Sequence, residues 1–179
     1  MMTDGHVAIE AMDLLLRTSA TVSGSRVKEW IAARDPDVLS VVYEAVSKAS
    51  DRLDGGVLPD VYFELVKTLF STLLHKQGHS DYALSPYDAG RVYAAFLLQC
   101  AERAAADPEQ ARLLRAGAEH LGTAYKAGDE TQRRCIVDGV VEHVFHDDTA
   151  RSAFSEWARD AILKGAYAEA AEWAKERDL

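Results

Sequence analysis

A short run of acidic and imidazole side chains contains the densest group of possible metal ligands in the sequence. Glu142 and His146 are four residues apart, which places them on one helical face, and His143 precedes His146 by three. A transition metal normally needs further ligands from another helix, as repeated Glu-x-x-His motifs provide in di-iron bundles. This sequence contains no Glu-x-x-His motif. We therefore interpret the run as a polar helix end whose histidines favour the C-terminal dipole, and keep a metal site as the alternative.

Cys135 lies on the same predicted helix, seven residues before Glu142, and with His146 it is expected to face away from the valines. A thiol, a carboxylate and an imidazole can together form a nucleophilic site. Two helical turns, about 10 Å, separate Cys135 from Glu142, which is too far for a hydrogen bond. The sequence also contains no phosphate-binding loop, dinucleotide fingerprint, zinc signature or nucleophile elbow. We therefore interpret this face as solvated, assign no catalytic or cofactor-binding residue, and favour a non-catalytic function.

The helix that must position these side chains is predicted to begin in a tight turn. Gly128 is expected to end the preceding helix in the left-handed conformation, while Asp129 caps the next helix and Gln132 completes a capping box. The new helix is rich in β-branched residues, so its stability should depend on packing rather than on propensity. Its buried face is predicted to consist of Ile136, Val137, Val140, Val141 and Val144.

Proline and glycine, with 4 and 11 residues, are scarce, and each proline is typical of a first helical turn. Between these breaks apolar residues recur every three to four positions, which indicates helices and leaves no convincing strand. The rows in 60–76 place Leu65 and Phe70 in the core. The predicted helices cover 6–18, 25–34, 36–53, 60–76, the segments that begin after Ser85, Asp107 and Asp129, then 149–164 and 166–177.

The last two predicted helices carry small and aromatic residues on their inner faces. In 149–164 we expect Phe154, Trp157 and Ala161 to face inward and Gly165 to end the helix. In 166–177 the inward residues should be Ala170, Trp173 and Ala174. Together these patterns predict an all-α fold, a single domain over 1–179 built as a bundle of antiparallel helical hairpins with about nine helices.

Charge and composition narrow the classes of partner. There are 29 acidic residues against 20 Lys and Arg, which gives a net charge of −9. Such a surface repels nucleic acid and steers in a basic partner, although the same charge also serves solubility. No apolar run reaches the roughly 18 to 20 residues needed to span a bilayer, so no membrane contact is expected. Because no secretory signal is visible and two cysteines form no disulfide framework, we expect a cytoplasmic location.

Two stretches resemble a bacterial family of all-helical, immunity-like proteins of toxin systems. In 55–70, Leu58 and Pro59 lead into an apolar helix with the acidic Glu64, and in 127–145 a Gly-Asp hairpin enters a helix that carries Val141 and Glu142. The sequence departs from the family pattern at Val57, where the family has Leu, and at Glu64, where it has Asp. The resemblance covers about half of the chain. It implies a toxin-binding or small-partner role and no catalytic residues.

Three hypotheses about function follow from the sequence. The first is a non-catalytic protein-binding module that neutralises a basic toxin or effector through an acidic surface. The second is a metal-dependent enzyme or sensor that uses Glu142, His143 and His146. The third is a helical scaffold, because the segment 164–178 resembles the first helix of a tetratricopeptide repeat, although it occurs once. The identity of the partner and the oligomeric state stay open.

Overall fold

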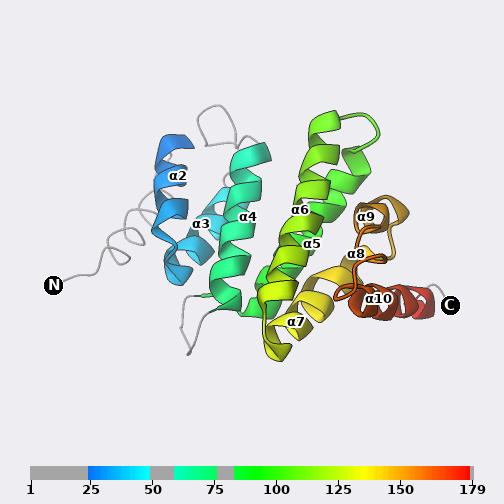
Figure 1. Ribbon diagram of the computed structural model, residues 1–179. Coiled ribbons are helices and arrows are strands. Elements are labelled where there is room, and N and C mark those ends of the chain that lie inside the picture. Colours follow the sequence, from blue (N-terminus) through cyan, green and yellow to red (C-terminus); the bar gives the residue numbers. More distant parts are fainter. Residues whose placement is uncertain (1–23, 49–58, 76–82, 178–179) are drawn as a thin grey trace. The chain divides into compact units, whose positions relative to one another are not determined.

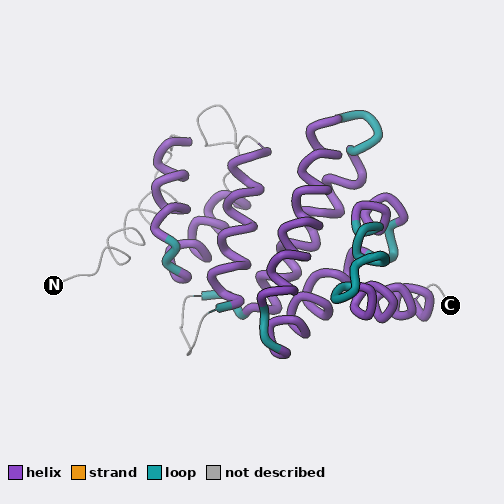
Figure 2. The backbone as a smooth tube through the Cα atoms, viewed as in Figure 1, coloured by secondary structure: helices purple, strands orange, loops and turns teal. Residues whose placement is uncertain are grey.

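The computed structural model describes residues 24–48, 59–75 and 83–177, and in these ranges the chain consists of helices joined by turns, without strands (Figures 1 and 2). The all-α prediction is therefore confirmed. The predicted helix at 6–18 and the end of the one at 36–53 lie outside the described residues. The chain divides into two compact units, Met1–Ser85 and Pro86–Leu179. A single domain over 1–179 stays a prediction beside this division.

Three helices of the first unit pack against one another. They are α2 (Gly24–Ala33), α3 (Pro36–Lys48) and α4 (Pro59–Leu74). Asp35 begins α3, because its Oδ1 accepts hydrogen bonds from the backbone N–H groups of Asp37 and Val38, both at 3.0 Å. Leu65 and Phe70 of α4 are fully buried, as the apolar rows predict.

The second unit holds the helices that surround the candidate sites. They are α5 (Pro86–Arg103), α6 (Pro108–Ala127), α7 (Glu130–Ile136), the π-helical segment η2 (Val137–Val141), α8 (Glu142–Val144), α9 (Asp148–Ala153) and α10 (Lys164–Arg177). The first two form a long antiparallel hairpin, and α7, η2 and α8 follow one another without a break (Figure 1). If this run is counted as one, the described ranges contain eight continuous helices. The sequence predicts nine for the whole chain, and one of these, 6–18, lies outside the described ranges.

Local signals place most helix starts where the sequence predicts them. All four prolines stand at the first residue of a helix. The capping box is present, since Asp129 Oδ1 accepts from the N–H of Gln132 at 2.8 Å and Gln132 Oε1 accepts from the N–H of Asp129 at 3.0 Å. The predicted left-handed conformation of Gly128 is wrong, because this residue has φ −76° and ψ 155°. An extended conformation suffices here, since its N–H still bonds to the carbonyl of Ala124 at 2.9 Å.

The core of the second unit forms where η2 crosses α5. A Cβ atom on Gly90 would lie 3.0 Å from the carbonyl carbon and oxygen of Gly139, so the two backbones meet directly. Val140 and Val141 of η2 and Tyr93 of α5 have no exposed surface. The predicted buried face of this helix is therefore confirmed, since all five of its residues are buried: Ile136, Val137, Val140, Val141 and Val144.

The predicted helix 149–164 is correct only as far as Ala153, where α9 ends. From Phe154 to Leu163 the chain forms consecutive turns, with Trp157 N–H bonded to the Phe154 carbonyl at 2.9 Å. Three-residue turns of this kind bring positions three apart onto one side, so Phe154 and Trp157 both reach the core, with ring centroids 5.1 Å apart. Ala161 is exposed rather than inward, and Gly165 lies in the first turn of α10 instead of ending a helix.

Candidate functional site

The candidate metal ligands Glu142, His143 and His146 do not gather at one point in the structure. Glu142 is buried at the start of α8, His143 is half-buried, and His146 is exposed in the turn that follows. In the part of the chain that the structure describes, no three His, Cys, Asp or Glu side chains come together as a possible metal site. Helical spacing alone therefore does not bring Glu142, His143 and His146 to a common position where they could bind one metal ion.

Cys135 and Glu142 are not on a solvated face, so that prediction is wrong. Both are buried, with 3% and 8% of their surface exposed. For Glu142 the cause is the π-helical segment that precedes it, because its wider turns rotate the following residues relative to a regular α-helix. A residue that α-helical spacing assigns to solvent thus turns inward.

The two cysteines are protected from ionisation. Burial raises the pKa of the Cys135 thiol to about 11, and the Asp138 carboxylate acts in the same direction. Burial likewise raises the pKa of Cys100 to about 11, against a smaller opposite effect of Arg103. Because the thiolate is the nucleophile, neither side chain is prepared for covalent chemistry at neutral pH.

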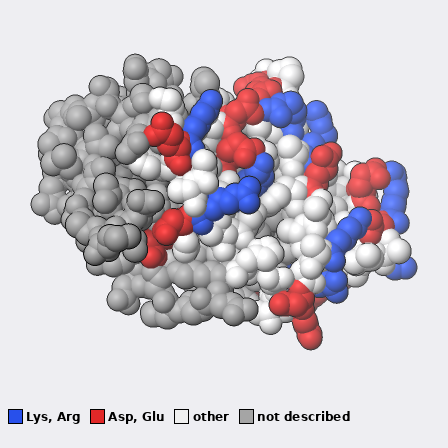
Figure 3. Space-filling view, turned by 60° about the vertical axis from the view of Figure 1, so that its left-hand side comes forward, with Lys and Arg blue, Asp and Glu red and all other residues white. Residues whose placement is uncertain are grey.

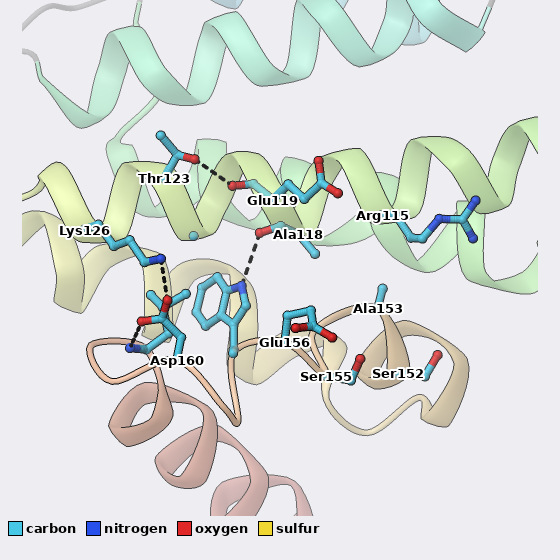
Figure 4. A pocket seen from close by; sticks show the side chains of 13 residues that line it. Arg115, Ala118, Glu119, Thr123, Lys126, Ser152, Ala153, Ser155, Glu156 and Asp160 are labelled. Atoms are coloured by element: carbon cyan, nitrogen blue, oxygen red, sulfur yellow. Dashed lines mark hydrogen bonds and ion pairs between the residues drawn. The ribbon is translucent and has the colours of Figure 1, made fainter.

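A cleft of about 440 Å³ lies between α6 and the segment 152–163 (Figure 4). This volume falls within the range of small binding pockets in proteins. Lys126 and Asp160 stand at one end of the cleft, and Arg115 lies toward the other (Figure 4). The cleft is lined by Arg115, Ala118, Glu119, Gly122, Thr123, Lys126, Ser152, Ala153, Ser155, Glu156, Trp157, Asp160 and Leu163.

The indole of Trp157 closes the base of the cleft. It is 3% exposed, and its Nε1–H donates to the carbonyl oxygen of Ala118 at 3.3 Å. A Cβ atom on Gly122 would lie 3.1 Å from Nε1 of Trp157 and 3.3 Å from Cδ1 of Leu163. Gly122 therefore permits the indole to approach the α6 backbone, and this contact fixes the turn segment against the helix.

An ion pair joins the two walls at one end. Lys126 Nζ lies 2.5 Å from Asp160 Oδ2, and the hydrogen bond from Lys126 lowers the pKa of Asp160. The other oxygen of Asp160 accepts from the N–H groups of Ile162 and Leu163, at 2.9 and 3.2 Å. Asp160 thus shapes the turn and anchors it to α6, so the charges of both partners are already satisfied.

Arg115 and Glu119 line the cleft differently. They stand one turn apart on α6, both are exposed, and within the described ranges neither side chain makes an ion pair. The preceding pair on the same helix, Arg112 and Glu109, is joined at 2.5 Å. An acidic residue that precedes a basic one suits the helix dipole better than the reverse order, which is the order of Arg115 and Glu119. Two opposite charges are therefore available at the cleft.

The facing wall contributes hydroxyl groups and one more carboxylate. Ser152 donates its hydroxyl hydrogen to the Thr149 carbonyl at 2.7 Å, which leaves its oxygen able to accept a bond. Glu156 pairs with Arg159 at 3.1 Å, but both side chains are about four-fifths exposed, so solvent screens the pair. Ser155 lines the same wall and is exposed.

One residue of the cleft follows from the sequence: Trp157 is predicted to face inward, and its burial confirms this. The sequence does not reveal the other lining residues, because they come together only where the chain from Phe154 to Leu163 turns instead of continuing as a helix and lies against α6. Gly122 offers the one local signal, since a glycine inside a helix often marks a close approach of another segment.

The residues that line the cleft include charges of both signs, and so does the face of the molecule drawn in Figure 3. On the face shown in Figure 3, acidic and basic side chains of the described residues lie next to one another instead of forming one large patch. Within the same residues, no helix is long and apolar enough to cross a lipid bilayer.

Comparison with known proteins gives no further identification. No protein family, no curated protein and no solved structure matches this chain. The resemblance to immunity-like proteins therefore stays a prediction.

Proposed function

We propose that this protein is a non-catalytic binding module that docks a protein partner at the cleft on α6. One observation carries this proposal: a preformed cleft of about 440 Å³ has an apolar base and charged residues at its rim. Such a combination of apolar contact and a few orienting polar groups is typical of binding sites. The Trp157 contact and the Lys126–Asp160 ion pair hold both walls in place, so a partner would meet a rigid surface.

The partner proposed here is basic, in the manner of a toxin or effector neutralised by an immunity-type protein. The net charge of −9 would steer a cationic protein toward this chain. At the cleft, Glu119 lies on α6 and Glu156 on the facing segment (Figure 4). Carboxylates on both walls would favour cationic side chains of the partner at the rim.

The metal-dependent alternative finds less support. Its three candidate ligands, Glu142, His143 and His146, differ in burial and are not gathered at one point. The two thiols are buried with raised pKa values, so they do not supply a nucleophile in its place.

Co-expression with the product of the adjacent gene tests the proposal. We expect a stable complex on size-exclusion chromatography, and a dissociation constant measured by calorimetry. The double substitution Glu119→Lys and Glu156→Lys should weaken this complex at least about tenfold, because opposed charges across an interface contribute strongly to affinity. The matched control, Glu102→Lys and Glu172→Lys, makes the same change in charge on exposed residues outside the cleft. If no complex forms, or both double variants weaken it equally, docking at the cleft is wrong.

A further inference from the structure

The charges inside the cleft specify more than a preference for a basic partner. Of the charged residues that line it, Lys126 and Asp160 neutralise each other at 2.5 Å. Glu156 has an exposed partner in Arg159. Arg115 and Glu119 remain, one of each sign and, among the described residues, without an ion pair. A ligand with a single charge would satisfy one of them and repel the other.

The spacing of these two residues matches an extended chain. Arg115 and Glu119 are four residues apart on α6, so their Cα atoms are displaced by about 6 Å along the helix axis. In an extended segment, side chains two residues apart point to the same side and are separated by about 6.6–6.8 Å. One acidic and one basic side chain at positions i and i+2 of such a segment would meet the two charges of α6 together.

We propose that the cleft binds an extended segment of the partner that carries one acidic and one basic side chain two residues apart. The acidic side chain pairs with Arg115 and the basic one with Glu119. This inference rests on the proposed function, in which the cleft is the docking site. The partner is then basic overall and still places one carboxylate opposite Arg115.

The facing wall suits the backbone of an extended segment. Such a segment has N–H and C=O groups that need hydrogen-bond partners when they leave water. The Ser152 oxygen can accept an N–H, because its own hydrogen is directed to the Thr149 carbonyl. Ser155 presents a hydroxyl on the same wall.

Four capped tripeptides test this chemistry on the intact protein. The probes are acetyl-Lys-Ala-Glu-amide, acetyl-Lys-Ala-Gln-amide, acetyl-Gln-Ala-Glu-amide and acetyl-Gln-Ala-Gln-amide. Titration is followed by NMR at the backbone amides of Ala118, Gly122 and Ala153 and at the Trp157 indole N–H. Each charge should tighten binding about threefold, as is usual for exposed ion pairs, so the mixed peptide should bind about tenfold tighter than the neutral one.

Two protein variants assign each charge to its residue. In Arg115→Gln the gain from the peptide Glu should vanish while the gain from the peptide Lys persists, and in Glu119→Gln the pattern should be reversed. Arg112→Gln and Glu109→Gln are matched controls on the same helix, outside the cleft, and should preserve both gains.

The segment chemistry is wrong if the mixed peptide binds no tighter than the neutral one, if no cleft resonance moves, or if the gains survive both variants. These outcomes are separable from the proposed function. A complex with the co-expressed partner that depends on Glu119 and Glu156 would then still support docking at the cleft.

Discussion

The crossing of α5 with η2 and the contact of α6 with Trp157 both depend on a glycine, yet one forms core and the other borders a cleft. At the crossing, Gly90 meets the backbone of Gly139, and aliphatic side chains fill the surroundings. At the cleft, Gly122 meets an indole that comes from a turn segment rather than from a helix. Two backbones can approach along several residues, whereas one inserted ring touches the helix locally and leaves space beside it.

This difference also separates the chemistry of the two regions. The crossing contains fully buried valines, and the nearby thiol of Cys135 is held neutral by burial. The cleft retains exposed charges and hydroxyl groups because the ring that closes its base does not cover its rim. Close packing of helices removes water from side chains, while a side chain wedged between a helix and a turn leaves polar groups accessible.

The largest expected effect comes from removing the Trp157 ring, which lies between α6 and the turn segment. Trp157→Ala deletes a nearly fully buried ring and should cost about 3–5 kcal/mol in the free energy of unfolding. Trp157→Phe keeps an aromatic ring but loses the hydrogen bond to Ala118, and should cost about 1–3 kcal/mol. Urea denaturation followed by circular dichroism measures both. If Trp157→Ala lost less than Trp157→Phe, the indole would not support the cleft.

The second prediction concerns thiol reactivity, which compares the access of water to the cleft and to the buried core. At pH 8 a thiol with a pKa of about 11 is ionised to about one part in a thousand, against about a quarter for an exposed one. Ser155→Cys, in the cleft, should therefore react with a disulfide reagent at least about a hundredfold faster than Cys100 or Cys135. The absorbance of the released thiol gives the rates. Fast reaction of the folded wild-type protein would show that the crossing is not dry.

The next prediction compares the two glycines of the crossing, because a Cβ atom on Gly90 would be crowded and one on Gly139 would not. Gly90→Ala forces a methyl group to within 3.0 Å of backbone atoms, so it should destabilise the fold by about 1–3 kcal/mol. Gly139→Ala places its methyl group 3.6 Å from the Gly90 Cα, an ordinary contact, and should be neutral or slightly stabilising. Thermal unfolding of the two variants provides the comparison. Equal losses would contradict the proposed geometry of the crossing.

The smallest expected effect concerns a glycine that belongs to neither region. A Cβ on Gly165 meets nothing within 4 Å, and the residue lies in the first turn of α10. Gly165→Ala should therefore stabilise the protein by about 0.4–1 kcal/mol through the unfolded chain. Differential scanning calorimetry detects a gain of this size. A loss would mean that the position needs the freedom of glycine after all.

Local chemistry explains how much of the fold was predictable. The four prolines and the capping box at Asp129 act within three or four residues, so sequence alone places these helix starts. The apolar periodicity likewise identified Leu65, Phe70 and Val140 as core. The cleft was not predictable in this way, because Arg115 and Glu119 form it with residues about 40 positions later in the chain.

The sequence by itself determined that this chain is helical, where most helices begin, and which apolar rows they bury. The tertiary structure decided that 154–163 turns instead of continuing as helix, and that η2 widens and directs Glu142 inward. It also decided that Arg115 and Glu119 border a cleft. Helix starts depend on hydrogen bonds between near neighbours, whereas these features depend on fitting Trp157 and the Gly90–Gly139 crossing into limited space.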